Sequence, residues 1–332
     1  MHRSKRKLLW NSAGSILYLS MPGRAEESLR REFPDLETVI ARDKETVAQG
    51  LVGCEILATW NLSPEQFAVC RELRWVHSPA AGLDQICLDR LAERGVVLTN
   101  SGPVHAIPVA EHALALLLAM ARRLPFSVRN QGKGNWAQQE GWEPPQRASE
   151  INGATLGLIG LGCIGREVAV RARALGMRVV AVKRDPSRGQ EHADAVYAPG
   201  DLHKLLGEAD YVLLAAPELP ETRHLIGEPE LRAMKSSAVL LNVSRGSLVD
   251  TEALVRALET GAIAGAALDV TAPEPLPAEH GLWKLENVLI TPHLASATDR
   301  IWQRQMGLFT ENLRCYLAGK AMPHRVDLQK GY

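Results

Sequence analysis

The sequence has no excess of charge, because 38 lysines and arginines balance 38 aspartates and glutamates. A chain without net charge has no general attraction to nucleic acid or to an anionic membrane, so we expect neither as a partner. We also expect no membrane-spanning segment, since no apolar run reaches the length that a bilayer requires. Internal repeats and low-complexity stretches are lacking too. The 46% hydrophobic content is typical of a soluble globular protein.

Cysteine is scarce and follows no pattern: there are five, an odd number, and no C-x-x-C pair. This argues against a disulfide framework, and we expect a cytoplasmic protein and no metal site. The start of the chain is basic and then apolar, but Asn11, Ser12 and Gly14 interrupt it and no cleavage site follows. We therefore expect a frayed basic lead and a first strand near residues 15–20 rather than a signal peptide.

The chain is organised around residues 154–176, ATLGLIGLGCIGREVAVRARALG. Gly160, Gly162 and Gly165 fit G-x-G-x-x-G between an apolar strand at 155–159 and an amphipathic helix at 164–175. The first glycine permits a tight turn, the second lets the backbone approach a pyrophosphate, and the third lets the helix pack on the strand. A second strand at 177–182 completes a βαβ unit, which predicts dinucleotide binding.

Strands alternate with helices on both sides of this motif, which predicts α/β architecture with parallel sheets. We expect strands at residues 38–40, 56–58, 75–77, 96–99, 211–215, 238–242, 264–269 and 288–291, and helices at 25–32, 64–69, 83–93, 228–232, 251–261 and 299–317. The length suggests two domains. A small-residue turn, SPAAGL, follows the strand at 75–77, where ligands of parallel sheets commonly bind.

A strongly apolar helix is expected at residues 108–123, opening with Pro108 in its first turn and too short to cross a membrane. His112 on this helix is more typical of a hydrogen-bonded core residue than of a ligand. Residues 131–148 are polar and carry Trp136 and Trp142, which indicates a surface arm rather than a regular element. Exposed tryptophans there would suit a protein–protein contact.

Three polar residues follow strands of the second half: Arg245, Glu274 and His293. Parallel strands bring them to the sheet edge that carries the glycine loop, where a nicotinamide ring and its substrate would lie. Histidine suits proton donation to a carbonyl, a carboxylate would orient it, and an arginine can hold a substrate carboxylate. Each could instead be structural, as a salt bridge, a loop carboxylate or a core histidine. Together they indicate hydride transfer to a 2-oxo acid.

From about Leu73 to Ala318 the chain resembles the D-isomer-specific 2-hydroxyacid dehydrogenase family. The motifs that carry the resemblance are LGLIGLGCIGREVA, LLAAPELPETRHLI, LLNVSRGSLVDTEAL, ALDVTAPEPLP and LWKLENVLITPHLAS. The resemblance implies that Arg245, Glu274 and His293 form the catalytic trio. It also implies that Ala81 and Gly82, with Arg245 and His293, bind the substrate, and that Asp269 holds the nicotinamide carboxamide.

The family organisation implies two Rossmann-like domains with the active site in the cleft between them. A substrate-binding domain, residues 1–102, would be completed by 296–332, and a dinucleotide-binding domain would occupy 103–295. The resemblance further implies a homodimer formed through 108–148. Cofactor contacts would come from the glycine loop and the following strand ends: Gly160, Gly162, Cys163, Ile164, Gly165, Lys183, Arg184, Ala216, Pro217, Thr222, Val243, Ser244, Asp269 and Ala295.

The end of the second strand bears on cofactor choice. NAD-preferring proteins keep an acidic residue there for the ribose, whereas this chain places Lys183 and Arg184 there. Positive side chains would attract the 2′-phosphate of NADP(H), which we expect to be preferred, with NAD(H) possible. Two alternatives stay open: Asp185 would restore an acid after a two-residue slip, or the pair is merely a solvated turn.

Several functions remain as alternatives. A glyoxylate or hydroxypyruvate reductase is favoured by family analogy and by NADPH use in the reducing direction. An NAD-dependent dehydrogenase of the phosphoglycerate type is a rival, although we do not expect here the regulatory extension of its longer forms. Formate dehydrogenase is disfavoured because Glu274 stands where that enzyme has glutamine. A non-catalytic, dinucleotide-sensing binding protein of the same fold is the rival from another class. The substrate side chain and the direction of the reaction remain open.

Overall fold

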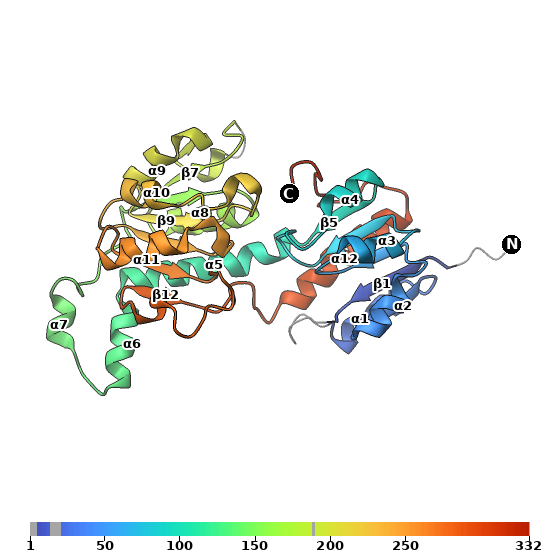
Figure 1. The fold of residues 1–332 in the computed structure, drawn as a ribbon, viewed down its shortest axis with the longest axis horizontal. Helices are drawn as coiled ribbons and strands as arrows, with labels where there is room; N and C mark the ends of the chain where they lie inside the picture. The colour runs from blue at the N-terminus through green and yellow to red at the C-terminus, as the bar shows by residue number, and fades with distance from the viewer. Residues whose placement is uncertain (1–4, 14–20, 188–189, 332) are drawn as a thin grey trace. The chain divides into compact units, whose positions relative to one another are not determined.

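The structure, a computed structural model, describes residues 5–13, 21–187 and 190–331. The chain divides into two compact units (Figure 1). Unit 1 comprises Met1–His105 and Ala297–Tyr332, and unit 2 comprises Ala106–Ser296. The strand expected at residues 15–20 lies outside the described residues.

Unit 1 contains a five-stranded parallel sheet in the order β2-β1-β3-β4-β5. Its elements are β1 (Lys7–Asn11), α1 (Gly23–Glu32), β2 (Glu37–Ala41), α2 (Lys44–Leu51), β3 (Ile56–Ala58), α3 (Pro64–Val69), β4 (Trp75–Ser78), α4 (Leu88–Glu93), β5 (Val97–Asn100) and α12 (Ile301–Leu317). The basic lead is therefore partly a central strand. The expectation of fraying was wrong for Lys7–Asn11, because Leu8, Leu9 and Trp10 are completely buried.

Successive side chains of β1 point to opposite faces of the sheet, so they pack into two different apolar layers of unit 1. Leu9 faces the layer formed by α2, α3 and α4. Leu8 and Trp10 face the opposite layer, which contains α1 and the C-terminal helix α12. Phe309 of α12 stacks on Trp75 at 5.5 Å between ring centroids and meets Trp10 edge-on at 4.9 Å. The C-terminal segment thus belongs to the core of unit 1.

Unit 2 contains a seven-stranded parallel sheet in the order β12-β11-β10-β9-β6-β7-β8. Its strands are β6 (Thr155–Ile159), β7 (Arg178–Val182), β8 (Ala195–Tyr197), β9 (Tyr211–Leu214), β10 (Val239–Asn242), β11 (Gly265–Leu268) and β12 (Val288–Ile290). Its helices are most of α5 (Gly102–Ala121), α6 (Leu124–Gly132), α7 (Gln138–Trp142), α8 (Cys163–Ala174), α9 (Leu202–Glu208), α10 (Glu228–Ala233) and α11 (Thr251–Glu259).

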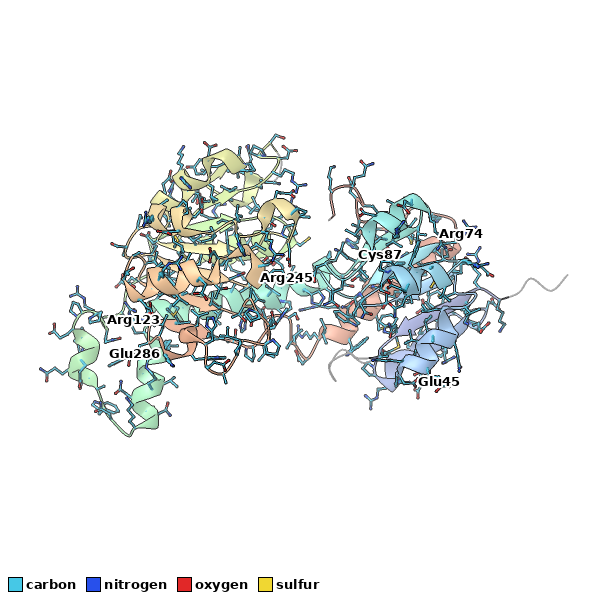
Figure 2. All side chains as sticks on the ribbon, viewed as in Figure 1. Glu45, Arg74, Cys87, Arg123, Arg245 and Glu286 are labelled. Atoms are coloured by element: carbon cyan, nitrogen blue, oxygen red, sulfur yellow. The ribbon has the colours of Figure 1, made fainter. Side chains whose placement is uncertain are left out.

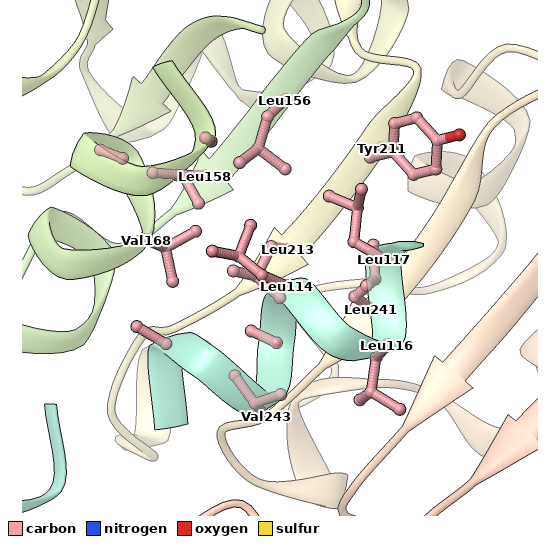
Figure 3. Close-up of a cluster of buried hydrophobic side chains, with 14 of the residues drawn as sticks. Leu114, Leu116, Leu117, Leu156, Leu158, Val168, Tyr211, Leu213, Leu241 and Val243 are labelled. Atoms are coloured by element: carbon pink, nitrogen blue, oxygen red, sulfur yellow. The ribbon is translucent and has the colours of Figure 1, made fainter. Parts of the chain in front are cut away.

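The central strands of unit 2 are apolar on both faces because helices cover both. Helices α5 and α8 cover one face, where Leu114 and Leu117 pack near Leu158, Leu213 and Leu241 (Figure 3). Helices α9, α10 and α11 cover the other face. Both units are α/β with parallel sheets, which confirms the expected fold class.

Helix α5 differs from its prediction in two ways. It begins at Gly102, so Pro108 lies inside the helix rather than in its first turn, while Pro103 occupies the first turn. With 20 residues and high hydropathy it is long enough to span a bilayer, so the length argument against this was wrong. Burial is the better criterion for distinguishing a core helix from a membrane span, because 67% of the most apolar 18-residue stretch of α5 is buried within the protein.

Other boundaries moved for local reasons. Residues 83–87 form a turn rather than the start of a helix, with Ile86 bridging to Leu62, so α4 begins at Leu88. Helix α2, strand β8 and helix α9 were not expected. The predicted arm contains helix α7, preceded by helix α6, and neither helix has a buried residue. Both project from the body of unit 2 (Figure 1).

Candidate active site

The glycine loop joins β6 to α8 with the geometry its spacing predicts. Gly160 has φ of +103°, and a Cβ there would lie 2.6 Å from the carbonyl oxygen of Ala215. A Cβ on Gly165 would collide with the carbonyl of Gly160, so the helix start can approach the strand only with glycine there. A Cβ on Gly162 would meet nothing within 4 Å. The turn is thus tight where it faces the protein and open beside the helix N-terminus.

The predicted cofactor residues beyond β9 and β10 lie next to this loop. The backbone at Ala215 and Ala216 touches Gly160, and the Ser244 hydroxyl donates to the carbonyl of Ala216. Thr222 donates to the carbonyl of Pro217 at 2.8 Å, which closes the turn after β9. Val243 is buried directly after β10. The loops that follow β6, β9 and β10 therefore form one continuous edge.

Gly246 brings the loop after β10 against the loop after β11. A Cβ on Gly246 would overlap the backbone of Thr271 and Ala272. No sequence motif points to this glycine, and only the contact between loops shows why a side chain is excluded. Arg245, labelled in Figure 2, is half-buried and its guanidinium donates to the carbonyl of Ser244 at 2.9 Å. Arg245 thus sits beside the loop that carries Glu274.

Glu274 and His293 are in direct contact, with 2.5 Å between Oε1 of the glutamate and Nδ1 of the imidazole. Both side chains keep access to solvent, at 45% exposure for His293 and 39% for Glu274. The hydrogen bond and charge of Glu274 raise the pKa of His293, while burial and the charge of Arg245 act in the opposite direction. The contact with Glu274 therefore orients the imidazole and favours its protonated form.

Asp269 follows β11 and is 2% exposed. Its carboxylate accepts from the Thr291 hydroxyl at 2.6 Å and from the backbone N–H groups of Leu294 and Ala295 at 2.9 and 3.0 Å. Burial alone would raise its pKa, but hydrogen bonds from His112, Thr291 and the backbone outweigh burial and lower it. Asp269 therefore carries a buried negative charge that organises the chain around His293.

His112 lies against this carboxylate, with Nε2 2.9 Å from the Thr291 hydroxyl and 3.3 Å from Oδ1 of Asp269. The expectation of a hydrogen-bonded histidine is confirmed. Its partners could not be inferred from the sequence, because Thr291 lies 179 positions away.

Val182 is the last buried residue of β7, whose final four residues are all buried. Lys183 follows, half-buried, and its backbone N–H donates to the carbonyl of Tyr197 at 3.1 Å. Arg184 forms an ion pair of 2.8 Å with Glu221 from the turn after β9. Asp185 accepts from the backbone N–H of Ser187 at 3.1 Å and so closes a local turn.

In unit 1, the loop after β4 is braced from several sides. The Asn100 side chain donates to the carbonyl of Ala81 at 3.1 Å, next to Gly82. The carbonyl of Pro79 accepts from the Gln305 side chain at 2.6 Å and lies 2.8 Å from Nε2 of His105. The sequence motifs did not indicate these bracing residues, because their partners lie 19 to 226 positions away along the chain. Within the described residues, no cluster of three or more possible metal ligands occurs and the five cysteines are free.

The fold and this edge define a dinucleotide-binding α/β oxidoreductase, and comparisons with known proteins give the family. Residues 114–295 match the family model for the NAD binding domain of D-isomer specific 2-hydroxyacid dehydrogenases. The glyoxylate reductase of Korarchaeum cryptofilum is 38% identical over 291 residues, which cover 86% of each chain.

Two solved structures extend the similarity to nearly the whole chain. An NADPH-dependent glyoxylate/hydroxypyruvate reductase from Sinorhizobium meliloti, in complex with NADP and malonate, has a TM-score of 0.81, 30% identity and 98% coverage of both chains. A D-lactate dehydrogenase from Aquifex aeolicus, complexed with NAD and lactic acid, has a TM-score of 0.78, 28% identity and coverage of 94% and 96%.

The chain belongs to the D-isomer specific 2-hydroxyacid dehydrogenase family. It is an NAD(P)-dependent oxidoreductase of the class that acts on 2-hydroxy acids.

Proposed function

We propose that this enzyme reduces a small 2-oxo acid such as glyoxylate or hydroxypyruvate, prefers NADPH, and uses His293 as its general acid. The proposal rests above all on the 2.5 Å contact between Glu274 and His293, which lie on the loops after the adjacent strands β11 and β12. The similar glyoxylate reductases support the substrate class. In the reverse direction the same imidazole acts as the base.

Each residue has a distinct part in this reaction. Because Nδ1 of His293 faces Glu274, Nε2 is the nitrogen that delivers the proton to the carbonyl oxygen of the substrate. Arg245 binds the substrate carboxylate with paired hydrogen bonds and draws electron density from the carbonyl. The resemblance to the family supports a further part for the backbone N–H groups of Ala81 and Gly82, which would bind the substrate carboxylate. The nicotinamide supplies the hydride when bound.

The glycine loop fits a dinucleotide. Side chains are excluded at Gly160 and Gly165 by backbone, whereas the space above Gly162 is open. The pyrophosphate would therefore bind over Gly162 and the first turn of α8, where Cys163 and Ile164 present N–H groups at the positive end of the helix dipole. The nucleoside and nicotinamide would extend along the neighbouring loops. The predicted cofactor residues on these loops are Ala216, Pro217, Thr222, Val243, Ser244 and Ala295.

The preference for NADPH rests on Lys183 and Arg184, which follow β7 where the adenosine ribose binds in such folds. Two cations there favour a 2′-phosphate. The ion pair with Glu221 means that the phosphate must compete with a carboxylate for Arg184. Asp185 is engaged by Ser187 within its own turn, which weighs against its use as the ribose-binding acid.

The arm supports a homodimer built through residues 108–148. Helices α6 and α7 bury none of their residues, and Trp136 and Trp142 are 86% and 71% exposed. Tryptophans exposed to this degree are typical of surfaces that a partner covers. The five free cysteines fit a cytoplasmic location, where thiols stay reduced.

The test is a panel of initial rates with NADPH and NADH against glyoxylate, hydroxypyruvate, 3-phosphohydroxypyruvate and a longer 2-oxo acid. We expect the fastest turnover with NADPH and a two- or three-carbon acid, and a loss of about 10²–10⁴-fold in His293→Ala. Preference for 3-phosphohydroxypyruvate would replace the substrate assignment. Binding of dinucleotide without turnover of any acid would favour a sensing protein instead.

A further inference from the structure

The loop that carries His293 is held by one carboxylate. Asp269 accepts three hydrogen bonds from it, from the Thr291 hydroxyl and from the N–H groups of Leu294 and Ala295. The backbone carbonyl of Asp269 accepts a fourth, from the N–H of His293 at 2.8 Å. Position 292 is proline and has no N–H, so every residue of the loop that can donate to Asp269 does so.

This anchoring explains how the backbone at His293 keeps an unfavourable conformation. His293 has φ of +53°, in the left-handed region that is unfavourable for a residue other than glycine. Such a conformation persists only where the surroundings over-determine it. Since the contacts of Asp269 reach the residues on both sides of His293, they fix the direction in which the imidazole leaves the backbone.

His112 completes this cluster from a different element. The Thr291 hydroxyl gives its proton to Asp269 at 2.6 Å and so offers a lone pair to Nε2 of His112 at 2.9 Å. Nε2 therefore carries the N–H, which also points toward Oδ1 of Asp269 at 3.3 Å. Helix α5 gives a rigid base for this donor, because its neighbouring residues Val109, Ala113 and Leu116 are packed in the core of unit 2.

We propose that His112 is a positioning residue for the reaction: its Nε2–H clamps Thr291 and Asp269 and so holds His293 in reach of Glu274. The inference rests on the proposed role of His293 as general acid. It assigns Asp269 a function in shaping the catalytic loop that does not depend on contact with the nicotinamide. The chemistry needed at position 112 is a hydrogen-bond donor at the distance of Nε2, not a charge.

The inference predicts a change in pH dependence as well as in rate. The groups that face His293 are Glu274, which favours its protonated form, Arg245, which opposes it, and Asp269, which favours it. Asp269 also faces His112, at 3.3 Å between Oδ1 and Nε2. If the clamp is lost, the loop relaxes and the contact between Glu274 and His293 loosens. The pKa of His293 then falls, and with it the pH above which reduction slows.

The experiment compares His112→Leu, which removes the donor, with His112→Gln, whose side-chain amide offers an N–H at the same reach. His203→Leu is the matched control, because it also breaks a histidine–carboxylate contact, the 3.1 Å pair with Glu230 on the surface. Steady-state rates of reduction are recorded from pH 5.5 to 9 with glyoxylate, or with the 2-oxo acid that is turned over fastest. Thermal unfolding and cofactor titration establish that each variant is folded.

For folded His112→Leu we expect kcat to fall about 10- to 10²-fold, with the high-pH limb of the profile moved to lower pH. His112→Gln should recover most of the rate and the original profile, and His203→Leu should match the wild type. An unchanged profile and kcat in folded His112→Leu would overturn the inference. So would equal losses in both His112 variants, which would indicate packing rather than donation. If His293→Ala retained its activity, the proposed role of His293 as general acid would be wrong. That result would be distinct from a failure of the role proposed for His112.

Discussion

The Nδ1 atom of His293 and the Oε1 atom of Glu274 lie 2.5 Å apart, although 19 positions separate the two residues in the chain. The contact forms because β11 and β12 are parallel neighbours, so that the loops after them leave the same edge of the sheet. Gly246 adds the loop after β10 to this edge by admitting the backbone of Thr271. The pair thus results from sheet order and one close backbone approach.

The pH dependence of reduction should follow the pKa of His293, which Glu274 raises. The protonated imidazole is the acid, so kcat/KM for reduction is expected to fall as the pH rises through this raised pKa. Glu274→Gln removes the negative charge and lowers the pKa of His293, so that the fall in kcat/KM moves to lower pH. Above the lowered pKa, each unit of pKa change is expected to reduce kcat/KM about 10-fold. Glu279→Gln, an exposed glutamate in the same connection, is the control. A profile unchanged by Glu274→Gln would contradict the assignment.

Cofactor preference should change when either the cations after β7 or the carboxylate paired with them is replaced. Lys183→Asp with Arg184→Ala is expected to lower the ratio of kcat/KM for NADPH to that for NADH by about 10-fold or more. Glu221→Gln should raise the ratio, because it frees Arg184 from the ion pair that the 2′-phosphate must displace. Initial rates with both cofactors test this. Equal ratios in the wild type and the double variant would show that the two cations form only a solvated turn.

The arm should control association of subunits. Trp136→Ala and Trp142→Ala are each expected to weaken a dimer by about 30-fold or more in Kd, as for buried tryptophans at interface centres. Sedimentation velocity over a concentration series measures this. Trp283→Ala provides the control, because that side chain is 50% exposed but lies outside the arm. A wild-type protein that sediments as a monomer at all concentrations would exclude the proposed dimer.

The stability of unit 1 should decrease in acid because of His77. This side chain is completely buried and bonds to Thr99 and Ser101, and burial lowers its pKa from 6.5 to about 3. The unfolded chain takes up a proton below pH 6.5 and the folded chain does not until about pH 3. As the pH falls between these values, protonation of His77 in the unfolded chain is expected to raise the unfolding equilibrium constant about 10-fold per pH unit.

Denaturant titrations followed by tryptophan fluorescence test this prediction, because Trp10 and Trp75 lie next to His77. His77→Gln keeps hydrogen-bonding groups but cannot take up a proton in this range. It should therefore lower stability at neutral pH and yet flatten the dependence between pH 6.5 and 3. An equally steep loss in His77→Gln would assign acid unfolding to other groups.

The local rules of the sequence predicted much of the second unit. The strand at Thr155–Ile159 and the helix that follows the glycines depend on apolar periodicity and on φ at Gly160, which are properties of neighbouring residues. The same rules failed near Lys7, where basic residues hid a buried strand. They also failed at Gly102, because Pro108 is typical of the first turn of a helix but this helix begins six residues earlier.

Local spacing along the chain was enough to predict the α/β class, the glycine loop and the residue types proposed for hydride transfer, because each depends on neighbouring residues. Which of these side chains meet depends on the packing of distant segments. His112 reaches Thr291 and Gln305 reaches Pro79 only because sheets and helices bring together segments that are far apart in the chain. A hydrogen bond depends on distances of about 3 Å between atoms. Spacing along a sequence cannot supply such distances once the chain has turned back on itself.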